Sequence, residues 1–323
     1  MSEFRYNKLA KHWVLFAPNR AKRPSNFEAI KENEKDITNC PFEKGNESQT
    51  PNEVARIEDE KGWKCRVVPN LYHALSIDED ISSYKTGCFE NKSGFGAHEV
   101  IIETPYHHKT MFEFTHEEFY DYFSIIKLRI DDLKKDIRLK YFSVFKNFGV
   151  NGGATLEHPH SQLIAMPFIP KTIENELIFY KKYKDDTQRD FFDDIIYEER
   201  NFAKGLLIEN ETFTAFCPYA SRYPFEINII CLKGKNSILD LSDSDIYSLC
   251  DIMSFCFGKL YKSLGKCDFN LLIKNGAINS DENFNRFHIQ IIPRLYRIAG
   301  FELDSNIMIN TFLPETAAKI LTK

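Results

Sequence analysis

Two histidines and a glutamine, His158, His160 and Gln162, have the types and spacing needed for chemistry on a phosphate group. Pro159 biases the residue before it toward an extended backbone, and the apolar run 163–166 is typical of a buried strand. Residues two apart in a strand point to the same side, so these three side chains are predicted to share one face. A neutral imidazole can attack phosphorus near pH 7, and an amide N–H stabilises charge on a phosphate oxygen. The trio therefore predicts nucleophilic catalysis.

A glycine-containing loop runs directly into these histidines and holds Gly149, Gly152 and Gly153. Glycine allows backbone N–H groups to approach a ligand closely, and several such groups together can cradle a phosphate. The loop is therefore predicted to supply further hydrogen-bond donors to the same group.

Three alternatives compete with this function. The histidines could be hydrogen-bonded polar groups at a strand end. They could be cupin metal ligands, because Gly152 and His158 fit the pattern Gly-x5-His-x-His; that pattern then requires a glutamate, where this chain has Ile164 and Ala165. The third alternative is a nucleotide-binding module without catalytic activity, which spacing alone does not exclude.

The composition narrows the class of protein. The 323 residues are 43% apolar and include 28 Phe, which is typical of a globular chain of one large or two medium domains. A net charge of −5 without a long basic tract argues against binding to bulk nucleic acid. Neither a signal peptide nor a run of eighteen apolar residues is found, so no membrane span is expected. Eight cysteines without a Cys-x-x-Cys pair indicate reduced thiols and a cytoplasmic protein.

The chain repeats one plan of elements. The segments 115–118 and 242–245 are both capping boxes that precede apolar residues at helical spacing, and they lie 127 residues apart (242 − 115 = 127). Further matches, each 128 residues apart, are Lys146-Asn147 with Lys274-Asn275 and His160-x-Gln162 with His288-x-Gln290. The repetition predicts two copies of a strand–helix–strand–loop–strand unit.

The second copy lacks residues that the predicted chemistry needs. Arg286 stands where the first copy has His158, and the second loop is acidic, with Asp281 and Glu282. The first copy is therefore predicted to be catalytic, through His160, and the second to be a scaffold.

Duplicated units carrying His-x-His-x-Gln resemble the transferase branch of the histidine-triad superfamily, and within it the galactose-1-phosphate uridylyltransferase family. The resemblance covers nearly the whole chain, in RYNKLAKHWVLFAPNRAKRP, CPFEKGNE, RVVPNLYHALS, HEVIIETPYH, EHPHSQ, FEINII and FHIQIIPR. It implies an α+β protein of two histidine-triad-like halves, residues 1–182 and 183–323. We expect antiparallel-rich sheets with helices packed on one face.

The resemblance also implies an activity and a set of site residues. His160 matches the nucleophile that attacks the α-phosphorus of a nucleoside-diphosphate sugar and forms a covalent nucleotidyl-histidine, and Gln162 matches the glutamine that binds the transferred phosphate. A sugar 1-phosphate then takes up the nucleotide, predicted to be UMP, in an enzyme that is usually a homodimer. Relatives instead use inorganic phosphate to cleave ADP-sugars or dinucleoside polyphosphates. The expected substrate-binding residues are Arg20, Arg23, Asn70, Tyr72, Asn147, Gly152, Gly153, Thr155 and Ser161.

Metal binding is a further expectation from the resemblance. Cys40, His107 and His158 match ligands of the family's zinc site, while Glu43 stands where a second cysteine is common. Carboxylate oxygen is an accepted zinc ligand, so a Cys-Glu-His-His site is chemically reasonable. A second metal site of some relatives is expected to be empty here, because its positions are Glu176, Asn275, Arg286 and His288.

Overall fold

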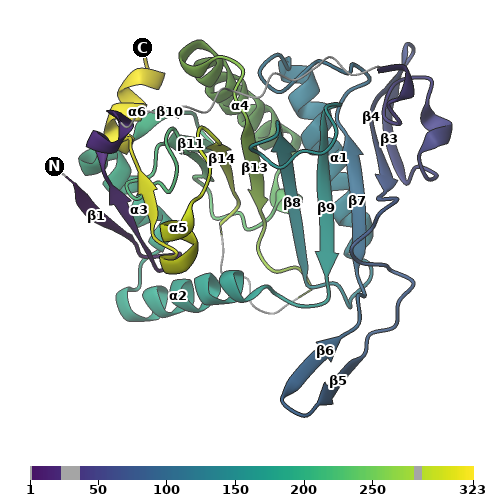
Figure 1. The fold of residues 1–323 in the computed structure, drawn as a ribbon, viewed down its shortest axis with the longest axis horizontal. Coiled ribbons are helices and arrows are strands. Elements are labelled where there is room, and N and C mark those ends of the chain that lie inside the picture. The colour runs from purple at the N-terminus through teal and green to yellow at the C-terminus, as the bar shows by residue number, and fades with distance from the viewer. Residues whose placement is uncertain (1, 23–36, 280–285) are drawn as a thin grey trace.

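Ten antiparallel strands form one continuous sheet through the middle of the molecule (Figure 1). We describe a computed structural model that covers residues 2–22, 37–279 and 286–323. The strand order is β10-β11-β12-β14-β13-β8-β9-β7-β4-β3. The first half supplies β3 (Ala55–Asp59), β4 (Gly62–Pro69), β7 (Ala97–Ile102), β8 (Tyr141–Phe148) and β9 (His160–Met166). The second half supplies β10 (Leu206–Glu209), β11 (Phe213–Phe216), β12 (Ile227–Cys231), β13 (Phe269–Lys274) and β14 (His288–Pro293).

Counted from the two edges inward, the halves run β3-β4-β7-β9-β8 and β10-β11-β12-β14-β13, so each strand has a counterpart at the same position in the other half. The innermost strands, β8 and β13, pair at the centre of the sheet. This arrangement confirms the predicted α+β fold with two similar halves. The predicted boundary after residue 182 falls inside α2 (Lys171–Thr187). Because the two halves share one sheet, the division describes the repeat and stays a prediction for independent domains.

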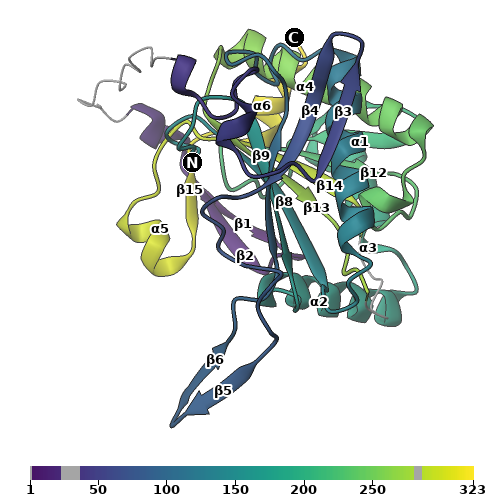
Figure 2. The same ribbon diagram turned by 90° about the vertical axis from the view of Figure 1, so that its right-hand side faces the viewer.

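One face of the sheet is covered by the two long helices that the capping boxes predict. In α1 (His116–Leu133) Thr115 is the N-cap, and in α4 (Asp243–Leu264) Ser242 is the N-cap, each with a complete capping box. Both helices bury an apolar stripe in the main core and pack against each other. The predicted placement of helices on one face holds for this pair, as Figure 2 shows.

The opposite face is covered only in part. There α2 and α3 (Phe191–Glu198) pack over the second half, where Phe192 and Ile196 meet Phe216 and Ile230. A small sheet of β1 (Glu3–Asn7), β2 (His12–Phe16) and β15 (Met308–Asn310), with the short α5 (Gly300–Ser305), lies on this side (Figure 2). The hairpin of β5 (Ser83–Thr86) and β6 (Phe89–Lys92) projects from the body (Figure 1).

The two copies are not aligned by a single offset. The glutamine of each copy pairs with the neighbouring strand, with Phe145 in the first half and Leu272 in the second. These partners are 127 residues apart (272 − 145 = 127), whereas the glutamines are 128 apart. Lys146 therefore corresponds to Ile273, and both side chains point to the α1 side of the sheet. Lys274, one residue later, points to the opposite face. The predicted match of Lys146 with Lys274 was out of register by one residue.

The N-terminal strand is tied to the C-terminal helix α6 (Pro314–Leu321). The guanidinium of Arg5 donates to both carboxylate oxygens of Glu315, at 3.0 and 2.9 Å. Nearby, buried Glu199 accepts the Tyr219 N–H at 2.7 Å through Oε1, while its Oε2 has no hydrogen-bond partner among the described residues. Burial raises the pKa of Glu199 to about 7, although the Tyr219 N–H and Arg5 act to lower it.

This carboxyl group makes the free energy of unfolding depend on pH. Its folded-state pKa lies above the ordinary 4.5, so its contribution is full below that value and is lost as the pH rises through 7. We expect Glu199→Gln to reduce the decline in stability between about pH 5 and about pH 8, by on the order of 1–3 kcal/mol. Urea denaturation at both pH values measures this change in the free energy of unfolding. Glu211→Gln, at an exposed position, is the control. If Glu199→Gln lost as much stability between the two pH values as the wild type, Glu199 would not be the group responsible.

Candidate active site

His160 begins β9 on the face of the sheet that points away from α1. Its Nδ1 lies 2.8 Å from the His158 carbonyl oxygen. A carbonyl can only accept, so Nδ1 carries the ring proton and Nε2 keeps the lone pair. The ring is 8% exposed and lies against Phe42, with centroids 5.4 Å apart. The nitrogen available for attack is therefore Nε2.

The surroundings of His160 keep its ring neutral. Burial lowers its pKa to about 4, the His158 carbonyl opposes this shift, and the Lys146 ammonium lowers the pKa further. An imidazole with this pKa is unprotonated near pH 7, which a nucleophile requires.

A buried ion pair lies beneath the strand that carries His160. Lys146 Nζ donates to the two oxygens of Glu103 at 2.9 and 2.8 Å and to the His160 carbonyl at 3.2 Å. Ser161 Oγ donates to Glu103 at 2.5 Å and contacts Tyr122 Oη at 3.0 Å. The Ser161 side chain thus points into the core, so the structure does not bring it to the face of His160. Sequence reasoning missed Glu103 and Lys146, although charged residues within apolar strands were a usable signal.

Gln162 lies on the same face as His160, as predicted, and is held by a residue that the sequence did not single out. His98 Nε2 lies 2.9 Å from Gln162 Oε1 and 3.1 Å from Asn70 Nδ2. The Ala74 N–H donates to His98 Nδ1 at 3.0 Å, which places the ring proton on Nε2. In this tautomer the proton goes to the oxygen of Gln162, and Asn70 Nδ2, which is itself a donor, forms no hydrogen bond with Nε2. The NH₂ end of Gln162 then remains to bind a ligand.

The glycine loop follows β8 and lies beside the joint of the two halves. The Gly152 carbonyl accepts from Asn270 Nδ2 at 2.7 Å, and the Asn151 N–H donates to Asp268 at 2.7 Å. A Cβ at Gly152 would lie 2.2 Å from the Phe148 carbonyl oxygen, so only glycine fits there. Gly153 has a φ of +86°, which also favours glycine. The loop backbone is therefore fixed in one place.

The other predicted substrate-binding residues differ in their surroundings. Asn147, in β8, accepts from Asn270 at 2.8 Å. Asn70 Oδ1 accepts the Tyr72 N–H at 2.9 Å, and the Tyr72 side chain is 88% exposed. Arg20 and Thr155 are also exposed. Arg23 lies outside the described residues.

Four predicted metal ligands converge beside the nucleophile. The ligand atoms of Cys40, His107 and His158 all lie within 4.8 Å of one another. Glu43 Oε2 is 3.1 Å from His107 Nδ1 and 3.5 Å from His158 Nδ1. The second nitrogen of His158, Nε2, donates to the Thr104 carbonyl at 2.8 Å and so turns the Nδ1 lone pair toward the cluster. The cluster Cys40, His107 and His158 can hold a metal ion.

Comparison with known proteins identifies the family of this chain. A model of the family described as galactose-1-phosphate uridyl transferase, N-terminal domain, matches residues 1–170, and a domain of unknown function (DUF4921) matches residues 96–323. The chain belongs to the galactose-1-phosphate uridyl transferase family. None of the helices in the described part of the chain is long and apolar enough to cross a membrane.

Relatives within this family are similar over nearly their full length. ADP-glucose phosphorylase of Arabidopsis thaliana is 30% identical, with 99% of this chain and 92% of the relative covered. Galactose-1-phosphate uridylyltransferase of Thermotoga maritima is 25% identical, with 99% and 98% covered. The crystal structure of the Arabidopsis phosphorylase with bound ADP-glucose superposes with a TM-score of 0.85 at 28% identity, covering 100% and 99% of the two chains.

The corresponding histidine of the second half has the same local geometry in other surroundings. His288 Nδ1 lies 2.8 Å from the Arg286 carbonyl, as His160 does from the carbonyl two residues before it. Arg286 forms ion pairs with Asp190 at 2.8 Å and Asp193 at 2.6 Å, and the Phe192 ring lies 5.7 Å from His288. The guanidinium has replaced the histidine that a metal site would need. The expected absence of a second metal remains a prediction.

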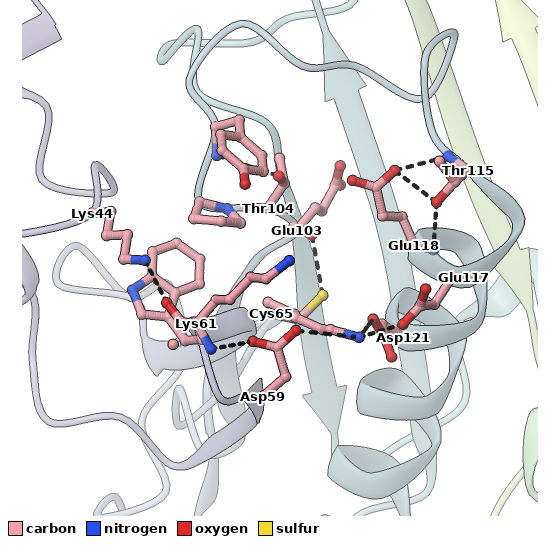
Figure 3. Close-up of a pocket in the computed structure, with 15 residues that line it drawn as sticks. Lys44, Asp59, Lys61, Cys65, Glu103, Thr104, Thr115, Glu117, Glu118 and Asp121 are labelled. Carbon is pink, nitrogen blue, oxygen red and sulfur yellow. Dashed lines mark hydrogen bonds and ion pairs between the residues drawn. The ribbon is translucent and has the colours of Figure 1, made fainter.

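A cavity of about 250 Å³ lies between β4, the segment after β7 and the start of α1 (Figure 3). Among its charged groups, Lys64 donates to Glu117 at 2.5 Å and lies 3.4 Å from Asp121. Its lining includes Cys65 and Glu103, which belong to the α1 side of the sheet. These two side chains approach the cavity from the α1 side of the sheet, whereas His160 lies on the other face.

Breaking the ion pair beneath the nucleophile should destabilise the fold strongly. Lys146→Met leaves the Glu103 carboxylate buried without its partner, which we expect to cost about 3–5 kcal/mol of unfolding free energy. Urea denaturation measures this loss. Lys171→Met removes an exposed pair with Glu174 and should cost less than about 1 kcal/mol. Equal losses of unfolding free energy in the two variants would contradict this prediction, because breaking the buried pair would then cost no more than breaking an exposed one.

Proposed function

We propose that this protein transfers a nucleoside monophosphate, UMP in the favoured case, from a nucleoside-diphosphate hexose to a phosphate-bearing acceptor through a covalent nucleotidyl-histidine at His160. One observation carries the proposal: a buried, neutral imidazole has its Nδ1–H fixed by a carbonyl, and its Nε2, on the face that carries Gln162, has no hydrogen bond to any described residue. Family membership supports the same chemistry, since similar proteins are named uridylyltransferases and a phosphorylase.

Each step exchanges one bond at the α-phosphorus. His160 Nε2 attacks it, the bond to the oxygen that bridges to the β-phosphate breaks, and hexose 1-phosphate leaves. An oxygen of the acceptor phosphate then attacks the same phosphorus, and the P–N bond breaks to release the neutral imidazole. The NH₂ of Gln162 and the loop N–H groups donate to the non-bridging oxygens, where negative charge must be held. Arg20 and Arg23 are proposed to supply cations.

Two acceptors fit this chemistry. Hexose 1-phosphate would give the exchange reaction of a uridylyltransferase, and inorganic phosphate would release a nucleoside diphosphate, as in a phosphorylase. The similarity to ADP-glucose phosphorylase in sequence and in structure supports the second candidate. We also propose a homodimer, which the resemblance to the family implies.

We propose that Cys40, Glu43, His107 and His158 bind zinc. Thiolate, carboxylate and two imidazoles form a donor set that zinc accepts in a tetrahedral site. A bound ion would supply structural order, because it would link the loop at Cys40 to the residue two positions before the nucleophile. The reaction itself is carried by His160, Gln162 and the loop.

Intact-protein mass spectrometry tests the covalent step. After incubation with UDP-glucose or ADP-glucose and no acceptor, we expect a mass gain of one UMP or one AMP that is removed by acid, as a phosphoramidate should be. His160→Ala should show no gain, and His288→Ala should retain it because that ring lies in the second half. Chasing the adduct with inorganic phosphate or with galactose 1-phosphate identifies the acceptor from the product. Tight nucleotide binding without an adduct would support the non-catalytic binding module instead.

Metal content tests the zinc proposal independently of activity. Purified protein should contain about one zinc per chain by elemental analysis, and Cys40→Ala should lose it because a tetrahedral site needs every donor. Cys88→Ala is the matched control, since Cys88 is an exposed thiol away from the cluster. A Glu43→Cys variant should keep its zinc. Wild-type protein that is free of metal after growth with added zinc would contradict the proposal.

A further inference from the structure

Asn270 of the second half lies directly opposite Asn147 of the first, in the β13–β8 pairing. The neighbouring pairing of Phe145 with Gln162 places Asn147 on the face of Gln162, at the level of His160. Asn270 therefore reaches the catalytic face across the joint between the two copies. Sequence analysis assigned it no role.

The hydrogen bonds of Asn270 leave its amide only one orientation. Its Oδ1 accepts from Arg294 Nη1 at 2.8 Å, and a guanidinium can only donate. Its Nδ2 donates to the Gly152 carbonyl at 2.7 Å, and a carbonyl can only accept. Both ends are thus anchored by groups that cannot exchange roles.

The same logic fixes the next amide in the chain of hydrogen bonds. The Asn270 Nδ2 also lies 2.8 Å from Asn147, whose contacting atom must therefore be its oxygen. The opposite end of the Asn147 side chain is its NH₂, a donor. An amide turned the other way would present oxygen to a phosphate and would repel it.

Arg294, which begins this chain of hydrogen bonds, has contacts of its own. The guanidinium of Arg294 lies over the Tyr223 ring, 5.1 Å from its centroid, and the Arg294 N–H donates to the Asp268 carbonyl at 2.8 Å. Asp268 also accepts the Asn151 N–H of the glycine loop. The second copy thus fixes both the loop and the amide beside it.

We propose that Asn270, held by Arg294, is a positioning residue that turns the NH₂ of Asn147 toward the transferred phosphate. This inference rests on the proposed nucleotidyl transfer. It assigns the second half of the chain a specific part in the chemistry of the first half.

Asn270→Asp tests the proposal with almost no change of shape. The carboxylate still accepts from Arg294, but it has no proton to give to Asn147 or to the loop, so Asn147 should turn its NH₂ toward the new charge. We expect first-turnover formation of the histidine adduct to slow by about 10²-fold, the typical loss of one well-placed donor to a developing charge. The dissociation constant of the donor nucleotide should change much less.

Two further variants separate this role from added charge and from misfolding. Asn228→Asp places a carboxylate on the same face in β12 and should leave the rate of adduct formation unchanged. Asn270→Ser removes the amide without adding charge and should also slow formation of the adduct, by about fivefold, because one typical hydrogen bond of about 1 kcal/mol is lost. Thermal unfolding shows whether each variant is folded.

A double variant tests whether Asn270 acts through Asn147. If Asn270 acts through Asn147, then Asn147→Ala alone and Asn147→Ala with Asn270→Asp should form the adduct at rates within a few-fold of each other. Losses that multiply in the double variant, or a wild-type rate in Asn270→Asp, would overturn the inference while leaving the proposed function intact. Wild-type protein that forms no adduct with any donor would overturn both.

Discussion

The pairing of β8 with β13 is the interaction on which the rest of the structure depends. It joins two five-stranded halves into one sheet, from Phe148 opposite Phe269 to Val144 opposite Ile273. A slip of one residue would turn every side chain of a strand to the other face, so the ladder permits a single register. This register places Asn270 beside Asn147 and carries the face of His160 into the second half. The β8–β13 register thus determines which residues lie beside the nucleophile.

The two copies show how much of an active site depends on the elements around it. His160 and His288 both have Nδ1 fixed at 2.8 Å by a carbonyl two residues earlier, and burial lowers the pKa of each to about 4. In both copies the carbonyl therefore orients the ring, and burial keeps it neutral. What differs is the packing, since α3 brings Phe192 against His288, whereas the first half places Phe42 and the Cys40 cluster beside its histidine.

Local signals in the sequence predicted much of this arrangement. The capping residues Thr115 and Ser242 and the shared face of His160 and Gln162 follow from patterns within a few residues, and the structure confirms them. The repeat follows from the recurrence of such local patterns along the chain, and the strand order confirms it. The one-residue change of offset between the copies escaped prediction, because identical residues can match in the wrong register. Asn270 escaped for a different reason: its partner is 123 residues away, and only the sheet register brings the two together.

Two amide side chains in this site, those of Gln162 and Asn147, must present the NH₂ end and not the oxygen to a phosphate. The two ends of an amide have nearly the same shape, so packing cannot select the end that meets a phosphate. Selection must come from partners with one fixed hydrogen-bonding role. For Gln162 the backbone N–H of Ala74 has that role, acting through His98. For Asn147 it belongs to Arg294 and the Gly152 carbonyl, acting through Asn270. Two such bonds at a net value of about 1 kcal/mol each favour one orientation by roughly thirtyfold, so the donor end faces the site in nearly every molecule before substrate arrives.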